Sequence, residues 1–141
     1  GWNSRLDEIQ ASILRIKLNH LDNDNQRRRK LAQHYDQILK NSNVLLPRER
    51  ESASQVYHLY VIRTAKRDSL KKYLEQNNVY CNIHYPVPIH LQPIYSKFSR
   101  VDNCIVTEEI SDQILSLPIY PELSFEKVEQ VSSLIDKFFD D

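Results

Sequence analysis

Two histidines and a tyrosine near the middle of the chain are the residues best suited to contact a ligand. His84 and Tyr85 stand three and four residues after Cys81, and His90 follows after two prolines. Cysteine and histidine can bind zinc, but a structural zinc site needs four ligands and this stretch supplies three at most. A loop rich in Pro, His and Tyr more often presents side chains to a ligand or an interface. We therefore predict ligand contacts for His84, Tyr85 and His90 and no metal site, although a structural role suits His90 equally well.

A second group of polar side chains lies at the start of the chain. Asn3, Ser4 and Arg5 precede a run of residues with helical periodicity. Asn3 or Ser4 could simply cap that helix, because both types are preferred N-cap residues. The fork of donors on Arg5 suits a phosphate, although an arginine in the first turn of a helix is ordinarily a solvated charge. The motif begins at residue 1 and the chain has no methionine, so we expect a piece of a longer protein.

The composition excludes several kinds of site and partner. The chain has a single glycine, Gly1, so a P-loop or a glycine-rich dinucleotide fingerprint is excluded within it. Nineteen basic and nineteen acidic residues cancel, which gives no support to a nucleic-acid or membrane partner. No signal peptide is present and Cys81 and Cys104 lack metal-type spacing, so we expect a cytoplasmic protein with reduced cysteines.

Three other features that could suggest a site are interpreted as surface or core. The basic run at residues 27–30 is predicted to be a solvated helix face, because four consecutive helical residues point in all directions. Glu108 and Glu109 are predicted to be surface residues, since adjacent helical side chains do not converge as an acid/base pair would. His58 lies in an apolar segment and is predicted to be a core histidine.

The hydrophobic pattern predicts helices first and then a mixture of strands and helices. A broad apolar stripe predicts an amphipathic helix near the start, which the polar run at residues 19–25 bends or breaks, and a second helix ends near residues 41–43. Strands are predicted at residues 56–63, 79–84 and 116–120, and helices at 68–76, 107–115 and 124–138. This order indicates an α+β fold, with long N-terminal helices followed by a small mixed or antiparallel sheet covered by helices.

Four segments together resemble the DegT/StrS family of sugar aminotransferases. They follow the family's order and approximate spacing, and they are GWNSRLDEIQA at residues 1–11, YHLYVI at 57–62, IHYPVPIHLQ at 83–92 and LSLPIYP at 115–121. The departures are small, since Trp2 stands where Tyr or Phe is more usual and Ser12 where Ala is. The resemblance is to the C-terminal part of these enzymes, which depend on pyridoxal 5'-phosphate and have the aspartate aminotransferase fold, fold type I.

The resemblance implies a homodimeric enzyme that transfers an amino group from an amino acid to a keto group of a nucleotide-linked sugar. The loop at residues 83–92 is most similar to enzymes of deoxysugar and polysaccharide biosynthesis that act on thymidine-diphosphate 3-keto-6-deoxy sugars. The family's Schiff-base lysine lies upstream of the matching part, so this chain alone is expected to be inactive. Residues 1–43 are expected to be interdomain or dimer-contact helices, and residues 44–141 a small C-terminal domain.

The resemblance also assigns roles to single residues. Asn3 matches an asparagine that reaches across the dimer to the cofactor phosphate, and Arg5 beside it would help to hold the cofactor or the sugar nucleotide. His84 and Tyr85 would contact the nucleotide diphosphate or the sugar, and no catalytic residue is expected in this chain. The alternative is a stand-alone, non-catalytic binding or interaction module that lacks the catalytic half. The length of the native reading frame would separate the two.

Overall fold

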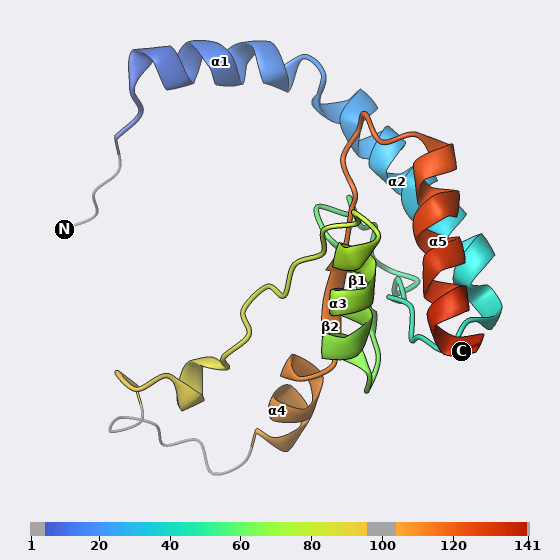
Figure 1. Ribbon diagram of the computed structural model, residues 1–141. Coiled ribbons are helices and arrows are strands. Elements are labelled where there is room, and N and C mark those ends of the chain that lie inside the picture. Colours follow the sequence, from blue (N-terminus) through green and yellow to red (C-terminus); the bar gives the residue numbers. More distant parts are fainter. Residues whose placement is uncertain (1–4, 96–103, 141) are drawn as a thin grey trace.

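The structure is a computed structural model that describes residues 5–95 and 104–140 (Figure 1). Its elements in chain order are α1 (Glu8–Leu18), α2 (Leu21–Ile38), the 3₁₀ turn η1 (Leu39–Asn41), β1 (Tyr60–Arg63), α3 (Arg67–Gln76), the 3₁₀ turn η2 (Ile89–Leu91), α4 (Ile105–Ser111), β2 (Ile114–Leu117) and α5 (Phe125–Asp140). Strands β1 and β2 pair antiparallel, with Tyr60 opposite Leu117 and Arg63 opposite Ile114. The predicted α+β class is therefore confirmed, and the sheet of the described residues is antiparallel.

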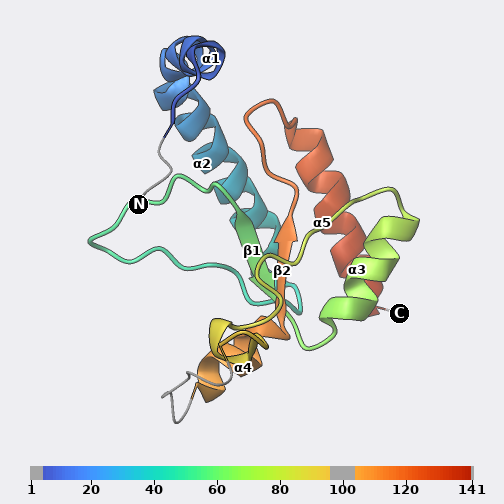
Figure 2. The ribbon, with the colours of Figure 1, turned by 90° about the vertical axis from the view of Figure 1, so that its left-hand side faces the viewer.

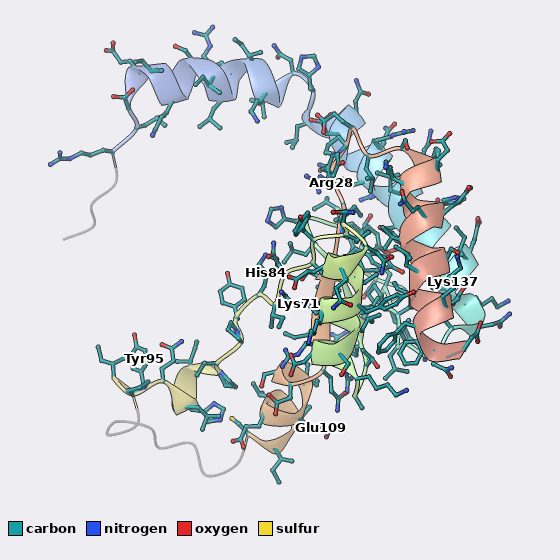
Figure 3. All side chains as sticks on the ribbon, viewed as in Figure 1. Arg28, Lys71, His84, Tyr95, Glu109 and Lys137 are labelled. Atoms are coloured by element: carbon teal, nitrogen blue, oxygen red, sulfur yellow. The ribbon has the colours of Figure 1, made fainter. Side chains whose placement is uncertain are left out.

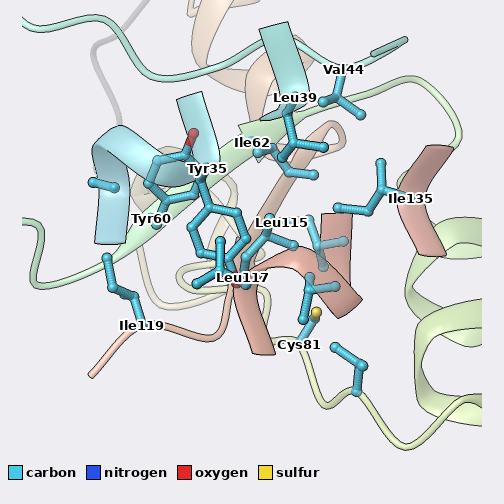
Figure 4. Packing of buried hydrophobic residues seen from close by; sticks show 14 of the residues in the cluster. Tyr35, Leu39, Val44, Tyr60, Ile62, Cys81, Leu115, Leu117, Ile119 and Ile135 are labelled. Carbon is cyan, nitrogen blue, oxygen red and sulfur yellow. The ribbon is translucent and has the colours of Figure 1, made fainter. Parts of the chain in front are cut away.

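Three helices form the layer that covers one face of this sheet. Helix α5 lies against both α2 and α3, and α3 lies against β2 (Figure 2). The side chains that meet in the core are aliphatic or aromatic: Leu31, Tyr35 and Leu39 from the α2 region, Leu70 and Leu74 from α3, Val128 and Ile135 from α5, and Tyr60, Ile62, Leu115 and Leu117 from the sheet (Figure 4). Alternate strand residues supply the sheet's share, as the two-residue period of a β-strand requires. The opposite face of the sheet carries Val61 and Ser116.

Helix α1 stands apart from this core. It projects away from the body of the molecule in Figure 1, and none of its residues is buried. Its large apolar side chains are all well exposed, from Ile13 at 50% to Ile9 at 72%. The N-cap of the helix is Asp7, whose carboxylate accepts a hydrogen bond of 2.9 Å from the Ile9 amide. The prediction that Asn3 or Ser4 caps this helix is therefore wrong, because Asp7 satisfies the free amide.

The strands are shorter than the hydrophobic pattern predicts. The predicted strand at residues 56–63 is confined to Tyr60–Arg63, because Tyr57 has a φ of 50°, outside the extended region. The predicted strand at 79–84 contributes one bridge, between Asn82 and Ser116. The elements predicted at 107–115 and 116–120 both begin earlier, at Ile105 and Ile114. Proline at position 118 has no amide to donate, which ends the second strand at Leu117.

Two predictions about charged and histidine side chains are also wrong. His58 is exposed rather than a core residue, because the turn at Tyr57 moves it out of the strand. The arginines of the 27–30 run are half-buried and donate to backbone carbonyls instead of forming a solvated face. Arg28 donates to the carbonyl of Ile119 at 3.0 Å, and Arg29 donates to that of Gln55 at 2.8 Å. Glu108 and Glu109 lie on the surface, as predicted.

Candidate functional site

His84 lies where the chain leaves the sheet. Two residues earlier, Asn82 forms a bridge with Ser116 of β2, so the segment enters the site from a position fixed by backbone hydrogen bonds. The His84 ring is half-buried, and its Nδ1 lies 2.8 Å from the Ser116 hydroxyl oxygen. No other described residue forms a hydrogen bond with this ring, so Nε2 is available to a ligand. Figure 3 shows the side chain beside the sheet, below the projecting α1.

Tyr85 turns the chain away from the sheet directly after His84. Its φ is 57°, in the left-handed region, which is uncommon for a residue with a large side chain. The side chain is 86% exposed, so its ring and hydroxyl are open to a ligand or to another chain. The structure therefore brings His84 and Tyr85 together at the end of the same short extended segment. Backbone outliers of this kind cluster at binding sites, which is consistent with the predicted role.

His90 is held by the protein rather than left free. It lies in η2, and its Nε2 is 2.9 Å from the carboxylate Oε1 of Glu108 in α4. The His90 side chain is only 14% exposed, whereas that of Glu108 is 47% exposed. This contact ties the segment after Tyr85 to α4. The geometry favours the structural reading of His90, as a residue that positions the loop.

The residues around Cys81 do not form a metal centre. Among the described residues, no group of three or more His, Cys, Asp and Glu side chains is placed to hold a metal ion. Cys81 is buried in the core, and burial raises the pKa of its thiol to about 12, so the thiolate that binds metals is disfavoured. Cys81 and Cys104 are both free thiols.

The N-terminal pair can be described only in part, because Asn3 lies outside the described residues. Arg5 is exposed, and it forms no hydrogen bond or ion pair with another described residue. A guanidinium that the protein leaves unpaired can offer its fork of N–H donors to a phosphate, so Arg5 fits that role by its chemistry. Among the described residues, no hydrogen bond or ion pair joins Arg5 to His84, Tyr85 or His90.

Ser116 is the residue at this site that the sequence reasoning did not identify. It is 5% exposed and stands between Leu115 and Leu117, two core residues. A serine in an otherwise apolar strand is a usable signal, because a buried hydroxyl normally has a hydrogen-bond partner. The partner could not be named from the sequence, since it lies 32 residues away, at His84.

Comparison with known proteins identifies the family. The model of the DegT/DnrJ/EryC1/StrS aminotransferase family matches residues 1–136. The chain belongs to this family. The resemblance seen in the four sequence segments is thus confirmed.

Relatives in this family include two sugar transaminases. The chain is 42% identical over 138 residues to dTDP-3-amino-3,6-dideoxy-alpha-D-galactopyranose transaminase of Aneurinibacillus thermoaerophilus. This match covers 98% of this chain and 38% of the relative. It is also 42% identical over 125 residues to dTDP-3-amino-3,4,6-trideoxy-alpha-D-glucose transaminase of Streptomyces venezuelae, covering 87% of this chain and 33% of the relative. The chain therefore spans well under half the length of these curated relatives.

Solved structures of the family have the same fold. The chain superposes on DesV of S. venezuelae, determined in complex with a ketimine intermediate, with a TM-score of 0.92 and 37% identity over 100% of this chain and 38% of DesV. The superposition on NtdA of Bacillus subtilis, with the bound cofactor PMP, has a TM-score of 0.85 at 27% identity and covers 34% of NtdA. The described elements are therefore those of the corresponding part of a fold type I aminotransferase.

Proposed function

We propose that this chain is the C-terminal part of an aminotransferase that uses pyridoxal 5'-phosphate to transfer an amino group to a keto group of a nucleotide-linked sugar. The observation that carries the proposal is the superposition of the whole chain on an aminotransferase holding a ketimine intermediate. The relatives' names support a sugar substrate. The substrate proposed here is a thymidine-diphosphate 3-keto-6-deoxy sugar, and the amino donor is an amino acid.

The N-terminal residues would hold the cofactor. When bound, pyridoxal phosphate carries the amino group and acts as the electron sink of the reaction. Asn3 and Arg5 offer an amide and a guanidinium to its phosphate, and the exposure of Arg5 leaves its donors free for that contact. In a homodimer these donors would serve the partner subunit. The exposed apolar face of α1 supports such an assembly, because a contiguous apolar patch of this kind is ordinarily buried against another protein surface.

The residues at the end of the 82–85 segment would bind the sugar nucleotide. The free Nε2 of His84 can donate to a diphosphate oxygen, and the exposed Tyr85 hydroxyl can bond to the sugar or the diphosphate. His90 acts less directly, by anchoring the loop to Glu108. This chain would bind the cofactor phosphate and orient the sugar nucleotide, and the lysine chemistry of the reaction would come from the upstream part of the full-length parent. We therefore expect no transamination by the 141 residues alone.

The decisive experiment is an amino-transfer assay on the full-length parent protein. The enzyme is incubated with pyridoxal phosphate, glutamate and a thymidine-diphosphate 3-keto-6-deoxy sugar, and the amino sugar is detected by mass spectrometry. A uridine-diphosphate keto sugar serves as the competing substrate, since a UDP-sugar aminotransferase is also among the relatives. Preference for the uridine nucleotide would correct the proposed substrate. If the native reading frame encodes only this part and no amino transfer occurs, the chain is instead a stand-alone binding module.

A further inference from the structure

We infer that Ser116 is a positioning residue for His84, which orients the imidazole ring and holds its proton on Nε2. Nε2 then presents an N–H donor to an anionic oxygen of the sugar nucleotide. The inference rests on the proposed function of His84 and adds to it a positioning residue and a tautomer of the ring. Its physical basis is the contact of 2.8 Å between the Ser116 hydroxyl and His84 Nδ1.

The backbone brings these two side chains together. The Ser116 amide donates to the Asn82 carbonyl at 2.8 Å, and the Asn82 amide donates to the Ser116 carbonyl at 3.2 Å. Side chains two residues apart on a strand share a face, so His84 is the diagonal neighbour of Ser116 across the bridge. Long or aromatic side chains span that diagonal. The paired backbones therefore set the contact, and it does not depend on the loop beyond Tyr85.

Ser116 lies on the sheet face that the helices leave free. Its pairing partner on β1 is Val61. The residues before and after it in the strand, Leu115 and Leu117, pack instead into the core beneath the helices. The hydroxyl is nevertheless almost inaccessible, since the residue is 5% exposed. A buried hydroxyl without a hydrogen-bond partner destabilises the folded chain. The ring of His84 supplies the partner, so rotating the imidazole away is unfavourable and its orientation is restrained.

The same contact favours one tautomer of a neutral His84. A serine hydroxyl can donate to Nδ1 or accept from Nδ1–H. No other described residue accepts the Ser116 hydroxyl proton, so only donation to Nδ1 satisfies this buried donor, and the ring proton of the neutral imidazole then lies on Nε2. No described residue forms a hydrogen bond with Nε2. The positive φ of Tyr85 takes the chain off the sheet directly after His84, so the backbone does not continue alongside the ring as a paired strand. The free nitrogen is therefore a donor, which is the polarity that a diphosphate oxygen requires.

The first test reads the His84 ring directly. Long-range ¹H–¹⁵N NMR of the chain, at a pH where the imidazole is neutral, should show the Nε2–H tautomer for His84. Ser116→Ala should shift the ring to a mixture of tautomers, and Ser116→Thr, which keeps the hydroxyl, should restore it. Ser132→Ala is the matched control, because Ser132 is a fully buried serine on α5. An Nδ1–H tautomer in the wild type, or an unchanged spectrum in Ser116→Ala, would overturn the inference.

The second test separates the inference from the proposed function. In the full-length parent, Ser116→Ala should raise the KM for the sugar nucleotide roughly two- to tenfold, the equivalent of one hydrogen bond, with kcat and cofactor affinity unchanged. Ser116→Cys keeps the volume with a weak donor and should behave likewise, and thermal unfolding checks that both variants fold. If His84→Ala leaves KM unchanged, the proposed role of His84 fails. If His84→Ala raises KM and neither Ser116 variant does, only the positioning role fails.

Discussion

The rings of Tyr35 and Tyr60 stack in the core with centroids 4.8 Å apart and an interplanar angle of 22°. Each hydroxyl leaves the stack toward a different acceptor. Tyr35 donates to the Pro118 carbonyl at 3.1 Å, and Tyr60 donates to the Asp36 carboxylate at 2.6 Å. Burial raises the pKa of both phenols, and the bond to Asp36 raises that of Tyr60 further. Both hydroxyls therefore stay protonated in the folded chain well above the pH at which an exposed tyrosine ionises.

Tyr60 should make the stability of the chain fall at high pH. Because its folded pKa lies above the unfolded value of about 10, the unfolded state loses the proton first, so the stabilisation is complete below pH ~10 and decreases above it. Tyr60→Phe should cost about 1–2 kcal/mol at pH 7, and this deficit should shrink by about 1.4 kcal/mol per pH unit above pH ~10. Urea unfolding from pH 7 to 11 measures both.

A surface tyrosine provides the control for this experiment. Tyr80 is 74% exposed, so Tyr80→Phe should change the free energy of unfolding at pH 7 by less than about 0.5 kcal/mol. A deficit in Tyr60→Phe that stays constant up to pH 11 would show that the phenol ionises equally in both states.

Arg28 should stabilise the chain through backbone carbonyls. One of its terminal nitrogens lies 3.0 Å from the Ile119 carbonyl and 3.4 Å from those of Tyr57 and His58, so a single guanidinium joins α2 to two loops. Arg28→Ala should lower the free energy of unfolding by about 1–3 kcal/mol, and Arg28→Lys should recover only part of the loss. The exposed Lys30 on the same helix is the control, and Lys30→Ala should stay within about 0.5 kcal/mol of wild type. Equal effects at the two positions in chemical denaturation would argue against the carbonyl contacts.

The apolar face of α1 should cause self-association of the isolated chain. Ile9, Ile13 and Ile16 are 50% or more exposed, and burial of such side chains is favourable by roughly 1.5–3 kcal/mol each. Sedimentation velocity should show dimers or larger species at high concentration, and Ile13→Asp should shift them toward the monomer. Gln10→Asp adds the same charge at an exposed polar position of the same helix and should leave the distribution unchanged. A strict monomer in both the wild type and Ile13→Asp would refute the proposed interface.

In the full-length parent, two groups of variants should separate cofactor binding from substrate binding. Asn3→Ala and Arg5→Ala should weaken pyridoxal phosphate by about 1–3 kcal/mol, the cost of removing a donor to a charged oxygen. His84→Ala and Tyr85→Phe should raise the KM for the sugar nucleotide with little loss of cofactor. Independent titrations of the two ligands distinguish these outcomes. Asn3→Ala that holds cofactor as tightly as wild type would remove that residue from the site, and loop variants that lose cofactor would disprove the assignment of His84 and Tyr85.

The helices could be predicted from the sequence because their signal is local. Apolar residues at helical spacing identify α3 and α5, and their observed starts at Arg67 and Phe125 lie within one residue of the predicted ones. The sheet could be predicted less well, because pairing depends on residues distant in the chain. The β-branched and aromatic run at 56–63 reads as one strand, yet the turn at Tyr57 removes its first half.

The same distinction between local and distant signals applies to the candidate site. The residue types at positions 84 and 85 could be singled out from the sequence because a loop rich in Pro, His and Tyr more often presents side chains to a ligand or an interface. The contact of His84 with Ser116, that of His90 with Glu108 and the carbonyl contacts of the arginine run could not, since each joins segments 18 or more residues apart. The predicted boundary between residues 1–43 and 44–141 stays a prediction. No described helix is long and apolar enough to cross a membrane, and a cytoplasmic location also stays a prediction.

Because α1 has no buried residues, the stability of this helix should depend on whether the chain is assembled with a partner. An isolated helix of 11 residues is marginal in water, because its hydrogen bonds barely repay the cost of nucleation. In the unassembled chain its amide protons should therefore exchange with solvent nearly as fast as those of an unfolded peptide, while those of α2 are protected by the core. When a partner surface covers the apolar face, exchange in α1 should slow. Deuterium uptake by this one segment would then report assembly without any enzymatic assay.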